Sequence, residues 1–315
     1  MSFTGLVHHS GHRLHETGAS HPERPERVTA ILERLTAAGV MSDLDRHQPA
    51  PAALEDIEAV HDPAYVRRVA AAAAAGETSL DSPDTTLARG SFEAARLAVG
   101  GALEAADRLM DGRWRNAFVA CRPPGHHAEA NLAMGFCLFN NVAVTAAYLR
   151  RHHGVERVAI VDWDVHHGNG TQHAFDDDPQ VYYASLHQWP LYPGTGRADE
   201  RGRDDGFGAT LNCPMAPGDG DEAYRRVLEE TVLRELDRFA PQVVLLSAGF
   251  DAHAADPLSA TRVTEAGYRQ MTRTILSLAR QHAGGRVLSL LEGGYDLEAL
   301  AASVLVHVEE LLGKA

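Results

Sequence analysis

The chain has 315 residues, of which 44% are hydrophobic, and a formal net charge of −14. That charge argues against a general nucleic-acid binder, which needs a basic face to neutralise phosphates, but it suits cationic substrates. No apolar stretch approaches the roughly 20 residues of a membrane-spanning helix, the N-terminal residues lack the apolar core of a signal peptide, and the three cysteines give no disulfide framework. We therefore expect a cytoplasmic protein that binds neither nucleic acid nor membrane.

The first third of the chain predicts a strand, two loops and three helices. The strand is expected at residues 4–8, and residues 11–27, rich in His, Glu, Arg and Pro, predict an ordered loop. Helical spacing of apolar residues, or abundant alanine, predicts helices at residues 28–38, 64–75 and 91–110. The polar residues 76–89 predict a loop between the last two helices.

Strands and helices alternate in the rest of the chain. Strands are expected at residues 117–121, 158–161, 181–186, 243–247 and 286–291, and helices at residues 140–152, 222–239, 264–282 and 297–312. This alternation predicts parallel βαβ units. The sequence contains no repeat, low-complexity linker or break in composition, so one α/β domain over residues 1–315 is the simplest organisation.

Polar residues follow the expected strand at residues 158–161, beginning with Asp162, Asp164 and His166. These three have the same parity and project to one side while the chain stays extended. Asp251 follows another strand, and the carboxyl ends of parallel strands share one edge of a sheet. Asp164, His166 and Asp251 would leave a coordination position open, as in a catalytic zinc site. Fe(II), Co(II) and Mn(II) also accept such ligands.

Two further clusters suggest catalysis. His126 and His127 follow a Pro-Pro-Gly turn and could act as general base and acid beside metal-bound water, with Asp162 holding His126 and Asn169 holding His127. The alternative is that both histidines are structural or bind metal themselves. Tyr295 follows two glycines and could donate its hydroxyl to an oxyanion, although a plain turn with a packed tyrosine gives the same pattern.

Six motifs occur in a fixed order: RPPGHHA, MGFCLFNN, DWDVHHGNGTQ, HQWPLYPGTG, SAGFDAHAADPL and LEGGY. Through these motifs the chain resembles the zinc-dependent histone deacetylase family, in its class II-like branch, from about Leu6 to about Leu311. The resemblance implies the arginase–deacetylase fold. That fold is a mostly parallel sheet of about eight strands flanked by helices, with the active site at the carboxyl ends of the strands.

The resemblance also implies a role for individual residues. The metal ligands would be Asp164, His166 and Asp251, and the cofactor one Zn²⁺, with Fe²⁺ or Co²⁺ as alternatives. The catalytic group would be His126, His127, Tyr295, Asp162 and Asn169. The substrate tunnel would be lined by Gly135, Phe136, Tyr192, Leu258 and Asp84, and framed at its mouth by the loop at residues 21–27. A structural K⁺ would bind at Asp162, Asp164, His166, Ser185 and Leu186.

Together these features predict a metal-dependent amide hydrolase that removes acetyl or other acyl groups from N-acetyl-lysine of proteins or peptides with metal-activated water. The alternatives are an acetylpolyamine amidohydrolase and a deacetylase of another small N-acetylated amine. Leu258 favours acetyl-lysine, because the polyamine-selective branch of the family carries an acidic residue there.

Two rival hypotheses differ in class. A two-manganese ureohydrolase would need further carboxylates where Gly168 and His253 stand. A non-catalytic binding module on the same fold would have lost Tyr295, His126 or a metal ligand, and all of them are present. The sequence leaves the oligomeric state open, a homo-oligomer included.

Overall fold

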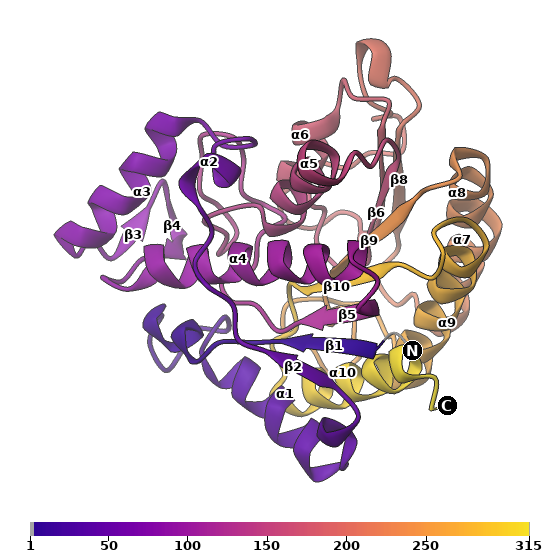
Figure 1. The fold of residues 1–315 in the computed structure, drawn as a ribbon, viewed down its shortest axis with the longest axis horizontal. Helices are drawn as coiled ribbons and strands as arrows, with labels where there is room; N and C mark the ends of the chain where they lie inside the picture. The colour runs from indigo at the N-terminus through magenta and orange to yellow at the C-terminus, as the bar shows by residue number, and fades with distance from the viewer. Residues whose placement is uncertain (1–2, 315) are drawn as a thin grey trace.

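The structure, a computed structural model, describes residues 3–314. An eight-stranded sheet with the order β2-β1-β5-β10-β9-β6-β7-β8 forms its centre (Figure 1), and every neighbouring pair of strands is parallel. The strands are β1 (Phe3–Val7), β2 (Asp45–His47), β5 (Trp114–Val119), β6 (Val158–Asp162), β7 (Val181–Gln188), β8 (Thr210–Met215), β9 (Val243–Ala248) and β10 (Val287–Leu291). The predicted parallel sheet of about eight strands is confirmed.

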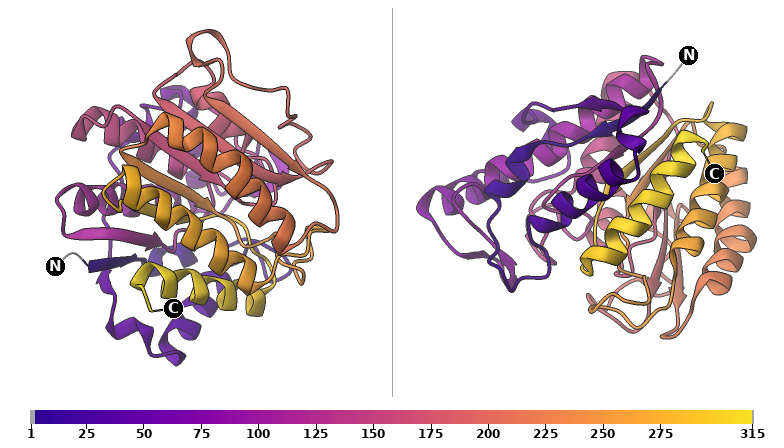
Figure 2. Two further views of the ribbon diagram at one scale, coloured as in Figure 1. Left: turned by 90° about the vertical axis from the view of Figure 1, so that its right-hand side faces the viewer. Right: turned by 90° about the horizontal axis from the view of Figure 1, so that it is seen from below.

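Helices cover both faces of the sheet (Figure 2), as the crossover connections of a parallel sheet require. One layer contains α1 (Glu26–Ala37), α7 (Asp221–Val227), α8 (Leu233–Phe239), α9 (Glu265–His282) and α10 (Leu297–Leu312). The other contains α2 (Leu54–Ile57), α3 (Pro63–Ala75), α4 (Ser91–Met110), α5 (Asn141–His153) and α6 (Asn169–Phe175). Within residues 3–314, no helix is both long enough and apolar enough to cross a bilayer.

The central strands are buried on both faces, which explains their almost continuous apolar sequences. All residues of β6 (VAIVD) and β9 (VVLLSA) are buried. On one face, α4 carries glycines where it packs against the sheet and a neighbouring loop. A Cβ atom at Gly101 would lie 3.1 Å from Cγ1 of Val7 in β1, and one at Gly100 would lie 2.0 Å from the carbonyl oxygen of Ala50, so glycine at these two positions follows from the packing of the helix.

The predicted elements differ from the structure mainly where strands are short or polar. The edge strands β2 and β8 were not predicted, and the expected loop at residues 76–89 contains an antiparallel hairpin of β3 (Ser79–Leu80) and β4 (Ser82–Thr86). Strand β5 begins at Trp114, three residues before the predicted start. Its polar residue Asn116 is buried and donates to the carbonyl oxygen of Leu311 at 3.0 Å, a contact that the strand sequence does not reveal.

Two expected segments have a more complex form. The expected loop at residues 11–27 contains most of the 3₁₀ turn η1 (Ser10–Leu14) and the first residues of α1. The expected helix at residues 222–239 is divided into α7 and α8 by a π-helical turn, η4 (Leu228–Val232). Short 3₁₀ turns, η2 (Val40–Ser42) and η3 (Asp204–Gly206), complete the connections.

The four central strands, β5, β10, β9 and β6, position the candidate site. Each runs into a loop with polar side chains at the same edge of the sheet, since all four are parallel. Register brings these strand ends level: Asp162 of β6 lies opposite Ser247 of β9, and Ala248 of β9 lies opposite Leu291 of β10. Side chains that are distant in the sequence therefore meet at this edge.

Candidate active site

Three buried side chains meet where β6 and β9 end. Asp164 and His166 follow β6, Asp251 follows β9, and each offers a ligand atom within 4.8 Å of the other two. The Nδ1 atom of His166 lies 3.1 Å from Oδ1 of Asp164 and 3.1 Å from Oδ2 of Asp251. We found no second group of metal-ligating residues with this spacing within residues 3–314. The predicted ligands are therefore close enough to share one cation.

Backbone groups and glycines hold the two carboxylates in place. Asp251 accepts a hydrogen bond from the Val165 N–H at 2.9 Å, and Asp164 accepts one from the Gly293 N–H at 2.7 Å. A Cβ atom at Gly293 would lie 2.0 Å from Oδ2 of Asp251, and one at Gly249 would lie 2.3 Å from Oδ2 of Asp164. Glycine is required at both positions because the carboxylates occupy the space of a side chain.

The electrostatics of this group fit a divalent cation. Burial, followed by the charge of Asp164, raises the pKa of Asp251 to about 7. Burial alone would lower the pKa of His166, but its hydrogen bonds to Asp164 and Asp251 raise it to about 10. Two buried carboxylates this close to one another are costly unless a positive charge compensates them. Two carboxylates and an imidazole suit zinc, and also Fe(II), Co(II) or Mn(II).

The paired histidines lie beside the triad, with their ring centroids 4.0 Å apart. The Nδ1 atom of His126 lies 3.0 Å from Oδ2 of Asp162, and that of His127 lies 2.8 Å from Oδ1 of Asn169. Burial lowers the pKa of His126, but the charges of Asp164 and Asp162 outweigh it and raise the pKa to about 10. Burial, then the positive charge of His126, lowers the pKa of His127 well below its usual value. The two imidazoles therefore differ in proton affinity.

Glu292, at the end of β10, supports the loop that carries these histidines. Its buried carboxylate accepts hydrogen bonds from the N–H groups of Gly125 at 2.6 Å and His126 at 3.2 Å. Glu292 belongs to the LEGGY motif, but no role was predicted for it from the sequence. A signal was present, because a carboxylate directly after an apolar strand is buried and must find donors.

A pocket of about 240 Å³ reaches His127 of the histidine pair and His166 of the triad. It is lined by Asp84, His127, Gly135, Phe136, His166, Leu191, Tyr192, Leu258 and Tyr295. Phe136 packs edge-on against Tyr295 with centroids 5.8 Å apart, and Tyr192 packs edge-on against His127 at 5.1 Å. All five residues predicted for a tunnel lie in its wall. Aromatic and aliphatic side chains form much of the wall, and Asp84, His127, His166 and the hydroxyl of Tyr295 contribute polar groups.

Tyr295 is held in this pocket through its backbone and its ring. Its N–H donates to Oδ2 of Asp256 at 2.7 Å, and the guanidinium carbon of Arg27 lies 5.0 Å from the ring centroid. Arg27 also donates to the carbonyl oxygen of Gly294 at 2.6 Å. Burial, followed by the charge of Asp251, raises the pKa of Tyr295 well above its usual value. The hydroxyl therefore stays protonated and can donate a hydrogen bond.

The loop at residues 21–27 was predicted to frame the mouth of the tunnel, and this role stays a prediction. The ring of His21 packs edge-on against Phe136 with centroids 4.8 Å apart. Glu23 and Arg27, in contrast, are fully buried and form an ion pair at 3.1 Å. Glu23 also binds Arg122 at 2.7 Å. Within this loop, Arg27 therefore contacts Tyr295, while Glu23 pairs with two buried arginines.

The residues predicted to bind K⁺ come from two neighbouring strand ends. Asp162 of β6 lies opposite Ser185 of β7 in the register, Leu186 follows Ser185, and Asp164 and His166 follow Asp162. The hydroxyl of Ser185 is 2.9 Å from Nδ1 of His187. This placement brings the five residues to one region, and their role as K⁺ ligands stays a prediction.

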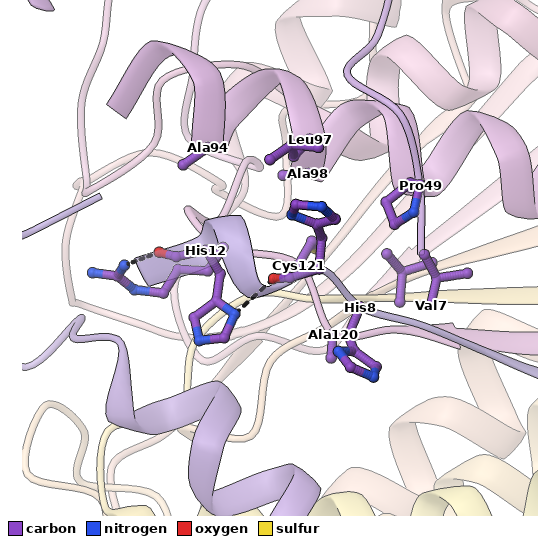
Figure 3. Close-up of a pocket in the computed structure, with 13 residues that line it drawn as sticks. Val7, His8, His12, Pro49, Ala94, Leu97, Ala98, Ala120 and Cys121 are labelled. Carbon is purple, nitrogen blue, oxygen red and sulfur yellow. Dashed lines mark hydrogen bonds between the residues drawn. The ribbon is translucent and has the colours of Figure 1, made fainter. Parts of the chain in front are cut away.

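A separate small cavity lies at the carboxyl ends of β1 and β5, under α4 (Figure 3). His8, His12 and Cys121 line one side of it, with Leu97 and Ala98 of α4 opposite. Its volume is about 10 Å³, the space of about one water molecule. A cavity of this size cannot hold a substrate, so the pocket above the triad is the candidate active site.

Comparisons with known proteins agree with this geometry. The family described as histone deacetylase domain matches residues 21–311. This chain belongs to the histone deacetylase family. A probable deacetylase from Archaeoglobus fulgidus is 41% identical over 94% of this chain and 82% of that protein. A histone deacetylase-like amidohydrolase from Pseudomonas aeruginosa is 41% identical over 94% of this chain and 78% of that protein.

One further relative and a solved structure extend the comparison. The human polyamine deacetylase HDAC10 is 39% identical over 92% of this chain and 44% of that protein. The crystal structure of the HDA15 HD domain superposes with a TM-score of 0.94 at 40% identity, covering 100% of this chain and 89% of that one. The histone deacetylase fold of this chain, and hence the predicted arginase–deacetylase architecture, is thus shown, and the ureohydrolase hypothesis is not supported.

Gly135 offers a test of how closely this histone deacetylase site is packed. It has a φ of +55°, and Phe136 after it has a φ of +69°. A Cβ atom at Gly135 would lie 2.3 Å from Cδ2 of His127. Gly135→Ala should therefore displace His127 and lower kcat, in addition to a backbone cost of about 1–2 kcal/mol for the left-handed conformation.

Gly154→Ala is the matched control for Gly135→Ala. Gly154 has a similar φ of +64°, but nothing lies within 4 Å of an added Cβ atom. Both variants should lose stability in thermal unfolding through the shared backbone cost, Gly135→Ala more because of its contact with His127, and only Gly135→Ala should lose turnover in a steady-state assay. Equal turnover in the two variants would show that His127 tolerates the added methyl group.

Proposed function

We propose that this chain hydrolyses the acyl amide bond of N-acetyl-lysine in peptides or proteins. One observation carries the proposal: an aromatic pocket is lined by His127, by Tyr295 and by His166, which belongs to a buried group of three candidate metal ligands. The walls suit a chain of methylene groups, and the inner end suits a polar carbonyl group. Family membership and the deacetylase relatives support the same reaction class.

The proposed cofactor is one Zn²⁺ at Asp164, His166 and Asp251, with Fe²⁺ or Co²⁺ as alternatives. When bound, the cation supplies Lewis acidity that polarises the substrate carbonyl and lowers the pKa of water. The cation's ligands come from two strands and are fixed by backbone N–H groups, so the protein supplies a preorganised donor set.

The residues of the chain supply the proton transfers. His127 lines the pocket and its Nδ1 atom faces Asn169, so Nε2 is the atom available to take a proton from the attacking water. His126, which lies beside Asp162, contributes positive charge close to the ring of His127. As the carbonyl oxygen becomes an oxyanion, the hydroxyl of Tyr295 donates to it. When the C–N bond breaks, the leaving amine takes a proton back from the histidine pair.

Acetyl-lysine is preferred over acetylpolyamines because of the residues at the mouth of the pocket. Leu258 provides no charge for the distal ammonium of a polyamine, which therefore gains little there. Asp84 lines the same pocket, and in the proposed function its carboxylate accepts a hydrogen bond from a peptide N–H group of the substrate. The second candidate, an acetylpolyamine amidohydrolase, is favoured by the 39% identity to a relative named as a polyamine deacetylase.

A deacylation panel tests the proposal. The purified, metal-loaded protein is assayed for kcat/KM with acetyl-lysine peptides, longer acyl-lysine peptides, acetylspermidine and acetylputrescine. We expect the highest value for an acetyl-lysine peptide. A clearly higher kcat/KM for an acetylpolyamine would replace the proposed function with the second candidate.

The substitution Leu258→Glu tests the argument about the mouth of the pocket. A carboxylate there should pair with the distal ammonium of an acetylpolyamine and raise its relative kcat/KM. The expected shift is up to about 5-fold, because an exposed ion pair contributes only about 0.2–1 kcal/mol. Leu54→Glu, which introduces the same charge at an exposed leucine of α2 outside the pocket, should leave the ratio unchanged. An equal shift in both variants would indicate a general charge effect.

A further inference from the structure

The side chain of Asn169, which faces His127, is itself held by a second residue. Its Oδ1 atom lies 2.8 Å from Nδ1 of His127, and its Nδ2 group donates to Oε1 of Glu129 at 2.5 Å. The same Nδ2 group also faces the backbone oxygen of His127 at 3.2 Å. Asn169 is buried, while the side chain of Glu129 is 19% exposed. Glu129 thus lies one hydrogen bond behind the pair of Asn169 and His127.

The orientation of the Asn169 amide matters because its two ends have opposite hydrogen-bonding roles. Oδ1 only accepts, so the Nδ1 atom of His127 that faces it must carry the hydrogen, which leaves the lone pair on Nε2. A rotated amide would direct N–H groups at Nδ1 and favour the other tautomer. Nε2 would then carry the hydrogen and could no longer accept a proton from water.

Glu129 distinguishes these two orientations more strongly than any other contact of the amide. A carboxylate accepts but never donates, and a charged hydrogen bond is roughly twice as strong as a neutral one. In the rotated amide, Oδ1 would face the carboxylate of Glu129 and repel it. The turn that carries Glu129 is fixed as well, since its backbone oxygen bonds to Nδ1 of the buried His61 at 2.9 Å.

We propose that Glu129 is a positioning residue that locks the amide of Asn169, and thereby the tautomer and orientation of His127. This inference rests on the proposed function, in which His127 takes a proton at Nε2. Glu129 touches neither the pocket nor the metal ligands, so its effect on turnover passes through Asn169. The carboxylate also contacts the half-exposed His173 at 2.9 Å, which holds it from the solvent side.

Removing the carboxylate should lower turnover without weakening substrate binding. We expect Glu129→Ala to reduce kcat roughly 10-fold, the lower end of the range for partners that orient catalytic-site ligands, with KM nearly unchanged and metal content equal to that of the wild type. Glu129→Gln should retain most of the activity, because its Oε1 atom can still accept from Asn169. If Glu129→Ala has wild-type kcat, or raises only KM, the proposal is wrong.

A double-mutant cycle shows whether the effect passes through Asn169. In the Asn169→Ala background, Glu129→Ala should cause no further loss of kcat. Glu200→Ala is the matched control, because Glu200 also accepts a hydrogen bond from a side-chain amide of α6, that of Gln172 at 2.9 Å. The effect of Glu200→Ala on kcat should be small and equal in the wild-type and Asn169→Ala backgrounds. Full additivity of Glu129→Ala and Asn169→Ala would contradict the proposal.

A second double-mutant cycle exchanges the carboxylate of Glu129 and the amide of Asn169. In this cycle the effect of Glu129→Gln on kcat should change sign between the two backgrounds. Asn169→Asp alone puts two carboxylates in contact and should lower kcat. Adding Glu129→Gln to that variant should raise kcat again, since the new amide donates to the introduced carboxylate, which still accepts from His127. If Glu129→Gln has the same effect in both backgrounds, the contact does not position His127.

An NMR measurement tests the inference independently of activity. In ¹⁵N-histidine-labelled protein, the His127 signals are assigned with His127→Gln. The wild type should show a slowly exchanging Nδ1–H proton, and Glu129→Ala should accelerate its exchange, whereas Glu200→Ala should not. An unchanged Nδ1–H signal in Glu129→Ala refutes the positioning role even if no substrate of the panel is hydrolysed. Absence of hydrolysis by the wild type with an altered signal would refute only the proposed function.

Discussion

Asp251→Ala should abolish stable metal binding and deacylation together. Asp251 is one of three ligands, and the other two come from the segment after a different strand. Its loss leaves two neighbouring side chains that cannot enclose a cation. We expect metal affinity to fall by more than the 10–100-fold caused by removal of a partner that only orients a ligand. Zinc content after dialysis and kcat/KM for an acetyl-lysine peptide are the two measurements.

Two further variants separate metal loss from unfolding. Asp251→Asn keeps an oxygen that can accept from the Val165 N–H, a bond of 2.9 Å in the wild type, so its fold should be preserved while its metal affinity falls. Asp176→Ala removes another buried aspartate, which pairs with Arg203 at 3.4 Å, and should retain its metal. Full zinc occupancy and activity in Asp251→Ala would exclude this residue as a ligand.

Tyr295→Phe should fold, keep its metal and lose about 10²–10³ in kcat, the usual cost of removing one oxyanion donor. The substitution deletes only the hydroxyl group. The ring contacts to Phe136 and Arg27 and the backbone bond to Asp256 remain. KM should change little, because the hydroxyl stabilises charge that develops in the transition state.

The control for this prediction is a tyrosine hydroxyl outside the pocket. Tyr148 of α5 donates to Asp107 at 3.0 Å and does not line the pocket, so Tyr148→Phe should keep normal kcat. Zinc content and thermal unfolding of both variants exclude indirect effects. Near-normal turnover of Tyr295→Phe would mean that Tyr295 serves only in packing.

Much of the fold follows from local sequence patterns. The buried strand β6 and the helix α4 were predicted nearly to the residue, since continuous apolar runs and alanine-rich periodic segments report their own burial. The edge strands β2 and β8 were missed because β2 is short and exposed and β8 mixes polar with apolar residues. Such segments become strands only through pairing with a neighbour, which no local pattern records.

The candidate site was also predicted only in part from the sequence. The sequence alone determined the parity of Asp162, Asp164 and His166, and the rule for parallel strands brought Asp251 to the same edge. Family resemblance supplied roles for the histidine pair and Tyr295. Their geometry, including the 4.0 Å separation of the histidine rings, required the register of the sheet.

Only the tertiary structure identified the residues that hold this site together. Glu129 contacts Asn169 across 40 positions of the chain, Glu292 contacts Gly125 across 167, and Arg27 contacts Gly294 across 267. Each is a charged residue whose sequence neighbourhood predicts an ordinary polar loop or strand end. Periodicity reports which side of an element is buried, whereas the partner of a buried charge depends on which distant loops the completed sheet brings to one edge.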